Sequence, residues 1–206
     1  MEVYTTENEQ VNAVRHFFAE NGKALAVGVV LGIGALVGWR YWQGHQTEAL
    51  TEASVSYQKA TDALMAKKPE GVAATEQFIQ ANDNNYGAFA ALQLAQHFVD
   101  LKEYDKASQQ LAKAAGLTKD ENLLPLISLR QARLQLQQNK LDEALKTLDG
   151  VKGESWAAMS LDIRGDVLAR KGDLKGARDA YSKGIDAKAS QAQQALLRMK
   201  LNNLAS

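Results

Sequence analysis

The chain has 206 residues, with 24 Lys and Arg against 24 Asp and Glu and no cysteine, which allows one or two small domains and excludes disulfide scaffolds and thiolate metal sites. The formal net charge of zero argues against a basic nucleic-acid-binding protein. With only 2 prolines and 7% aromatic residues, a composition rich in Ala, Leu, Gln, Lys and Glu predicts an all-α fold and argues against disorder or an all-β fold.

The first 22 residues predict a leader with a short amphipathic helix. Thr6-Glu7-Asn8-Glu9 fits a capping box, and Asn21-Gly22 is typical of a helix stop, so the helix is expected over about 7–20. Its apolar residues recur at helical spacing, as at Val11, Val14 and Phe18. This face could lie in the headgroup layer of a membrane, dock on a partner, or pack on the chain's own domain.

The next segment, from Ala24 to Trp39, has no charged and no polar side chain. A helix of these 16 residues is about 24 Å long, somewhat short of the roughly 30 Å apolar core of a bilayer. Lys23 and Arg40 can extend their charges outward, and aromatic residues form an interface belt at Trp39, Tyr41 and Trp42. We therefore predict a single transmembrane helix over 23–42, with a buried core helix and a cleaved signal peptide as open alternatives.

Charge says little about the orientation of this span. Arg15 and Lys23 precede it, and Arg40 and Lys59 follow it close enough to influence orientation. The rule that basic residues stay in the cytoplasm therefore favours neither orientation clearly. The lack of further basic residues before Lys59 slightly favours a cytoplasmic N-terminus.

Small residues recur in the span at two places. Gly28 and Gly32 form one G-x-x-x-G pair, and Gly34 and Gly38 form another, turned to a different side because six residues advance a helix by about 600°. Such faces let helix backbones approach closely in lipid, which predicts contact with a partner's transmembrane helix. The alternative is that glycine is simply frequent in membrane helices.

Beyond the span the chain repeats itself. An alanine followed four residues later by a bulky residue recurs at spacings of 33, 37 and 33 residues, as Ala74/Phe78, Ala107/Leu111, Ala144/Leu148 and Ala177/Tyr181. Twelve residues before the last three of these alanines stand the small residues Ala95, Ala132 and Gly165, whereas the first unit has Asp62. Small residues at helix crossings and bulky residues between hairpins are the pattern of a tetratricopeptide repeat.

We therefore predict that 43–206 forms a tetratricopeptide-like helical-hairpin solenoid whose first unit is degenerate and follows a helix over about 46–66. The expected helix pairs are 88–101 with 104–116, 122–138 with 141–150, and 155–171 with 174–186. A last helix over 190–204 should cap the stack, with a buried stripe formed by Ala192, Ala195, Leu196, Met199 and Leu204.

No catalytic or cofactor-binding site is expected. The three histidines are far apart in sequence, and no Ser lies in a G-x-S-x-G elbow. Asp162 and Asp166, one helical turn apart, could be paired acids, but no pocket or second ligand accompanies them in the sequence. The sequence thus favours a binding protein over an enzyme, without a metal or cofactor and with no role in binding nucleic acid.

A solenoid of helix pairs forms a concave surface from its first helices, where polypeptide segments lie. Matching the chain to the repeat predicts that this groove is polar and of mixed sign, with Phe89, Gln96, Asp100, Arg133, Gln137, Asp162, Asp166 and Arg170 on it. Such a groove suits weak, broad recognition of protein segments. For each residue the alternative is ordinary surface charge.

The leader contains Tyr4 and the motif Phe17-Phe18-Ala19-Glu20-Asn21-Gly22-Lys23, the span ends in Gly38-Trp39-Arg40-Tyr41-Trp42, and the motif Leu201-Asn202-Asn203-Leu204 follows the repeats. Together these motifs give the whole chain a resemblance to the YfgM family, ancillary subunits of the bacterial SecYEG translocon. It implies an inner-membrane protein with a cytoplasmic N-terminus and a periplasmic repeat domain.

The resemblance also implies partners. These are the SecYEG channel, the membrane-anchored chaperone PpiD and emerging secretory polypeptides, which the family is thought to help pass to periplasmic chaperones. The residues alone leave open a general cell-envelope scaffold that organises another membrane complex through the same groove.

Overall fold

The computed structural model describes residues 7–187 and 189–204. Tyr4 and Thr6, which contributed to the family resemblance and to the expected capping box, lie outside the described residues. The chain divides into two compact units, Met1–Glu52 and Ala53–Ser206, which are taken separately below.

The first described element is the helix α1, Glu7–Met65. The predicted helix end at Asn21-Gly22 is wrong, as is the division into separate helices over 7–20, 23–42 and 46–66, because α1 runs through all of them. The side chain of Asn21 donates a hydrogen bond to the Phe17 carbonyl at 3.1 Å and so continues the helix instead of ending it. An isolated glycine costs a helix only about 1 kcal/mol relative to alanine, and α1 contains no proline.

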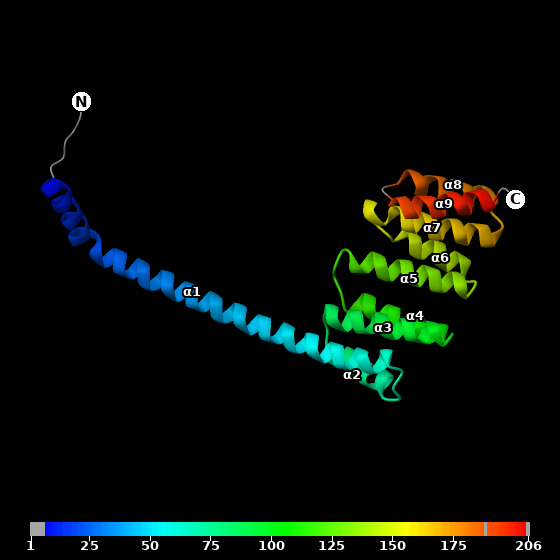
Figure 1. Ribbon diagram of the computed structural model, residues 1–206, viewed down its shortest axis with the longest axis horizontal. Coiled ribbons are helices and arrows are strands. Elements are labelled where there is room, and N and C mark those ends of the chain that lie inside the picture. Colours follow the sequence, from blue (N-terminus) through cyan, green and yellow to red (C-terminus); the bar gives the residue numbers. More distant parts are fainter. Residues whose placement is uncertain (1–6, 188, 205–206) are drawn as a thin grey trace, which may run out of the picture. The chain divides into compact units, whose positions relative to one another are not determined.

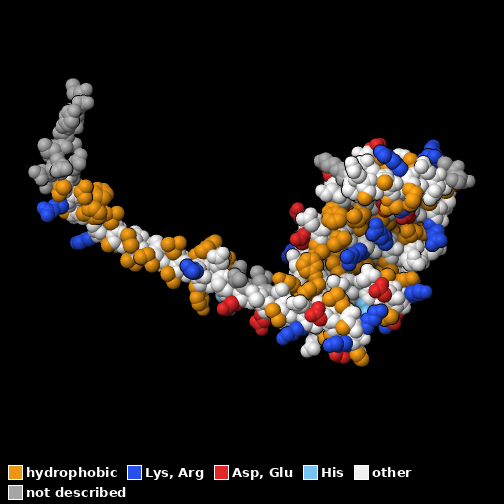
Figure 2. Space-filling view, viewed as in Figure 1, with side chains coloured by type: hydrophobic (Ala, Val, Ile, Leu, Met, Phe, Trp, Pro, Cys, Tyr) orange, Lys and Arg blue, Asp and Glu red, His pale blue; other side chains and the backbone are white. Residues whose placement is uncertain are grey.

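The apolar part of α1 covers Val14–His45 and has a mean hydropathy of 1.7 in its most apolar stretch, none of which is buried. Its 32 residues correspond to about 48 Å of helix, which exceeds the roughly 30 Å apolar core of a bilayer. Figure 2 shows hydrophobic side chains following one another along this helix with few basic groups between them. Among the described residues it is the one helix long and apolar enough to cross a membrane.

The second unit is built from antiparallel helix pairs, and the stack of α3 to α9 is visible in Figure 1. After the end of α1 come α2 (Gly71–Ala81), α3 (Asn85–Asp100), α4 (Tyr104–Gly116), α5 (Leu123–Gln137), α6 (Leu141–Asp149), α7 (Glu154–Lys171), α8 (Leu174–Asp186) and α9 (Gln191–Asn203). The pairs α3/α4, α5/α6 and α7/α8 confirm the three predicted hairpins, with boundaries within three residues of those expected. The all-α solenoid is therefore confirmed.

The predicted crossing positions account for how closely the helices approach. Ala107, Ala144 and Ala177 are completely buried. At Gly165 a side chain has no room, because a Cβ atom there would lie 2.2 Å from the ring of Tyr181. The bulky residues predicted four positions after the alanines are buried as well, at Leu111, Leu148 and Tyr181.

In the first repeat, formed by the end of α1 and by α2, the small residue at the helix crossing lies one position later than predicted. Thr75, not Ala74, is its completely buried small residue, whereas the predicted bulky residue Phe78 is buried, as is Ile79 four positions after Thr75. The Thr75 hydroxyl lies 2.7 Å from the carbonyl oxygen of Gly71 in its own helix and 3.1 Å from that of Ala60 on α1, so these two acceptors share its proton. Thr75 escaped the sequence pattern because the search required alanine at the crossing.

Three hairpin turns share one backbone feature. Lys102, Asn139 and Gly172 have φ values of +61°, +61° and +84°, each five residues before a crossing alanine. This left-handed conformation reverses the chain between the paired helices, and only Gly172 adopts it without a steric penalty. The turns of all three predicted hairpins thus have the same local backbone geometry.

The last helix presents a different face to the stack than predicted. Its completely buried residue is Leu197, which packs with Leu201 and Leu204 against α8. Of the predicted stripe only Leu204 is partly buried, whereas the others are exposed, as at Ala192, Ala195, Leu196 and Met199. The apolar residues of this helix form two stripes, and the predicted stripe is the one that faces solvent.

Candidate functional site

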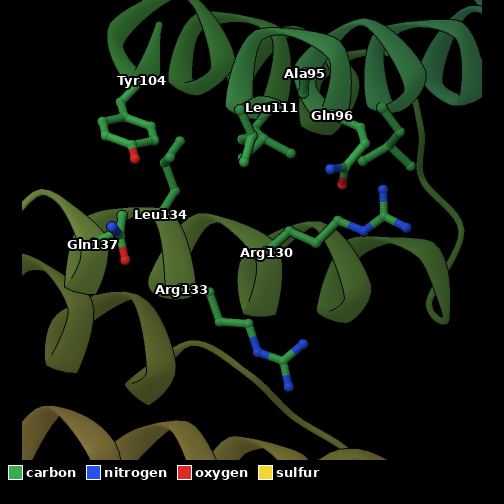
Figure 3. A pocket seen from close by; sticks show the side chains of 10 residues that line it. Ala95, Gln96, Tyr104, Leu111, Arg130, Arg133, Leu134 and Gln137 are labelled. Atoms are coloured by element: carbon green, nitrogen blue, oxygen red, sulfur yellow. The ribbon is translucent and has the colours of Figure 1, made fainter. Parts of the chain in front are cut away.

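A pocket of about 470 Å³ opens between α3, α4 and α5, the junction of two successive hairpins. Its size lies in the usual range for small ligand sites. Figure 3 shows Leu111 from α4 and Leu134 from α5 directed towards each other across the pocket. Two of the residues assigned to the groove from sequence, Gln96 and Gln137, contribute amide groups to its lining, and a third, Arg133, contributes a charge.

The floor of the pocket is apolar because the helices need the same side chains for packing. Leu92, Leu111 and Leu134 are buried and belong to one hydrophobic cluster, while Val99 is partly buried against it. Ala95, the small residue of the repeat pattern, leaves space between α3 and α5 that a larger side chain would fill. The pocket thus follows from the repeat itself.

Two arginines from α5 border the pocket. Arg130 and Arg133 are three residues apart and both exposed. In Figure 3 Arg130 extends between α3 and α5 towards Gln96, whereas Arg133 is directed away from α3. A guanidinium of Arg133 lies 4.0 Å from a carboxylate oxygen of Asp162 on α7, which is a long and weak ion pair.

A second polar cluster lies where α9 meets α7. The Lys200 ammonium is 2.7 Å from Asp162 Oδ1 and 2.7 Å from Asp166 Oδ2. Burial alone would lower the pKa of Lys200, but the hydrogen bonds to the two carboxylates outweigh this effect and raise the pKa above its ordinary value. Lys200 therefore stays charged at neutral pH and ties the last helix to α7.

Tyr181 of α8 completes this cluster. Its hydroxyl donates to Asp166 Oδ1 at 2.7 Å. Burial, together with this hydrogen bond, raises the pKa of the Tyr181 hydroxyl well above its ordinary value. Both carboxylates are thus engaged by a cation or a hydroxyl of the fold, which is the arrangement of a structural network and differs from a pair of free catalytic acids.

The eight residues predicted for the groove occupy different environments. Gln96, Arg133 and Gln137 line the pocket, and Gln96 donates to Asp100 at 2.8 Å. Phe89 is 41% exposed on α3, and Arg170 is exposed on α7. Asp162, only 5% exposed, and Asp166 lie beneath Lys200. The binding role of all eight stays a prediction.

Sequence reasoning missed Arg130, Tyr104 and Lys200. Arg130 could have been found from its helical spacing to Arg133, since residues three apart share a face. Tyr104 lies at the first position of α4, directly after the turn that joins α3 to α4. Lys200 carried no signal, because it lies on the stripe of α9 that was taken to face solvent.

The four glycines of the apolar segment, Gly28, Gly32, Gly34 and Gly38, are open on their outer sides. A Cβ atom built at any of them would meet no other group within 4 Å. Their backbones are therefore accessible to another helix, as helix contacts in a membrane require. Contact with a partner through these positions stays a prediction.

The chain is similar to known proteins over almost its whole length. Residues 15–206 match the family described as a tetratricopeptide repeat-like domain. The chain is 52% identical to the ancillary SecYEG translocon subunit of Escherichia coli (strain K12) over 204 residues, which covers 99% of each chain. It is 36% identical to the protein of the same name from Haemophilus influenzae, over 98% of this chain and 99% of that one.

Solved structures show the same fold at low identity. A MamA double mutant from RS-1 superposes with a TM-score of 0.54 and 16% identity, covering 74% of this chain and 94% of that one. MamA 41-end from Desulfovibrio magneticus RS-1 gives a TM-score of 0.54 and 14% identity, covering 74% and 93%. These likenesses support the fold alone.

Proposed function

Because the chain belongs to the tetratricopeptide repeat-like family of ancillary SecYEG translocon subunits, we propose that it is a non-enzymatic, membrane-anchored protein-binding subunit of that translocon. The observation that carries the proposal is the 52% identity to the Escherichia coli protein over 99% of both chains. The match includes the apolar segment as well as the repeats, so both parts of the chain have counterparts in that relative.

In this proposal, α1 crosses the inner membrane through the segment 23–42, with the leader 1–22 in the cytoplasm and the repeat domain 43–206 in the periplasm. The apolar stretch of α1 and its exposed side chains support the crossing. The open faces at Gly28 and Gly38 support lateral contact with helices of SecYEG or of PpiD, because small residues allow close helix packing in lipid.

The repeat domain then binds secretory polypeptides as they emerge and helps pass them to periplasmic chaperones. A domain tethered by its own chain to the channel needs only weak affinity, because tethering raises its effective concentration. Release of the polypeptide would depend on the difference between its affinity for this groove and its affinity for the next chaperone. The open pocket between α3, α4 and α5 supports such binding.

Purification from membranes tests the association. The tagged full chain, extracted in mild detergent, should recover SecYEG subunits and PpiD above the level recovered by an unrelated single-span protein. Gly28→Leu fills the first glycine face and should lower this recovery, whereas Leu36→Ile, at an exposed apolar position, should not. Recovery of a different membrane complex in place of the translocon would contradict the proposal and support the scaffold alternative.

A further inference from the structure

We propose that the pocket between α3, α4 and α5 binds a polypeptide segment that places a side-chain carboxylate against Arg130 and a neighbouring apolar side chain on the pocket floor. This inference rests on the proposed function, since it names the kind of client sequence that the repeat groove recognises. It assigns the recognition to one pocket instead of to the groove as a whole.

Arg130 is the residue that favours an acidic ligand. Its side chain is exposed, lines the pocket and extends between α3 and α5 (Figure 3), and it has no ion-pair partner among the residues that the structure describes. A guanidinium offers a planar set of donors that matches a carboxylate in a two-point contact. An exposed arginine beside an apolar cavity is therefore poised for an acidic ligand.

The charges around Arg130 reinforce this preference. Arg133 adds a second positive charge on the same helix. Its partner Asp162 lies 4.0 Å away and is bound by Lys200 at 2.7 Å, so its negative charge is already matched within the fold. Asp100 accepts a hydrogen bond from Gln96 and is not among the residues that line the pocket. The two charged side chains that line the pocket, Arg130 and Arg133, are thus both positive, whereas the nearby Asp100 keeps its negative charge because its partner is a neutral amide.

The apolar floor of the pocket determines which residue is preferred beside the acidic residue of the bound segment. The apolar lining from Leu92, Leu111 and Leu134 offers a dry surface to one side chain of moderate size. Burying a leucine side chain there instead of an alanine is expected to tighten binding by about tenfold. The amides of Gln96 and Gln137 at the edge can hydrogen-bond the backbone of an extended segment.

Peptide binding to the full chain in nanodiscs of zwitterionic lipid tests the proposal by fluorescence anisotropy. The probe is a short labelled peptide with both ends blocked, in which one glutamate adjoins one leucine, so the glutamate is its single carboxylate. We expect it to bind about tenfold more tightly than the same peptide with glutamine, as for one charge-assisted hydrogen-bonded contact. Replacing its leucine by alanine should weaken binding by a similar factor.

Two variants locate the contact. Arg130→Gln should erase the preference for glutamate while leaving the thermal unfolding of the chain unchanged, because the side chain is exposed and unpaired among the described residues. Arg178→Gln makes the same change at an exposed position on α8 that neither lines the pocket nor belongs to the predicted groove, and it should retain the full preference. Loss of the preference in both variants would mean general attraction between charges and would overturn the proposal.

Equal binding of the glutamate and glutamine peptides, no binding of either, or a preserved preference in Arg130→Gln would also overturn it. These outcomes are distinguishable from failure of the proposed function, because recovery of SecYEG from membranes depends on the anchored chain and is measured without any peptide.

Discussion

Ile33→Arg is expected to weaken the insertion of the protein into the membrane strongly. Ile33 lies near the middle of the uncharged stretch, and eight Leu, Ile and Val residues provide most of the insertion energy of that stretch. Each contributes about −0.3 to −0.6 kcal/mol, whereas a central arginine costs about 2.5 to 3.5 kcal/mol, so one charge cancels most of the total. The ratio of inserted to extractable protein, measured by alkaline extraction of membranes, should fall about a hundredfold.

Two controls separate charge from position. Ile33→Leu keeps the apolar character and should remain inserted. His45→Arg adds a charge at the end of the apolar segment, where a long side chain reaches the interface, and it should also remain inserted. A fully inserted Ile33→Arg variant would show that the membrane attachment does not depend on this segment.

Gly165→Val is expected to have the largest effect on the repeat domain. A Cβ at this position would lie 2.2 Å from the ring of Tyr181, and that ring cannot move freely because it is buried and its hydroxyl is held by Asp166. The forced separation of α7 and α8 should lower the free energy of unfolding by about 3 kcal/mol, the upper range for overpacking. In the full chain this corresponds to a fall in Tm of roughly 10 °C, measured by circular dichroism.

Gly116→Val serves as the matched control, since a Cβ at Gly116 meets nothing within 4 Å. It should change the free energy of unfolding by no more than about 0.5 kcal/mol, as is usual for surface substitutions. If both variants unfolded at the same temperature, the close crossing of α7 and α8 at Gly165 would not be a determinant of stability.

The repeats were predictable because one steric requirement recurs. Each hairpin needs a small residue where its helices cross, and this requirement appears as Ala107, Ala144 and Ala177 with a bulky residue four positions later. Agreement at three places fixed the register and the helix boundaries. In the first repeat the completely buried Thr75 meets the requirement, because the carbonyls of Gly71 and Ala60 accept its hydroxyl, so the alanine pattern placed the crossing one residue too early.

The continuity of α1 and the buried face of α9 could not be predicted from local sequence patterns. Asn21-Gly22 resembles a helix end, but the helix-forming residues on both sides continue α1 through it. The last helix carries two apolar stripes, and the choice between them depends on which one meets α8 and on the attraction between Lys200 and the carboxylates of α7. These contacts become visible only in three dimensions.

The candidate site was predictable in part. Matching to the repeat identified Gln96, Arg133 and Gln137, because the solenoid places equivalent positions of successive first helices on one surface. Matching to the repeat did not identify Arg130. Its role as a candidate ligand-binding residue depends on the cavity beside it and on the absence of an ion-pair partner among the described residues. The domain boundaries at residues 22 and 42 remain a prediction.

Site-specific crosslinking in membranes tests the central claim that the repeats hold emerging chains beside the translocon. A photoreactive residue in place of Phe89, exposed on α3, should capture a secretory chain arrested in the channel. The same group in place of Ala112, exposed on the paired helix α4, should capture much less. Capture from Phe89 that disappears when the arrested chain is released would match this account, whereas equal or absent capture from both positions would contradict it.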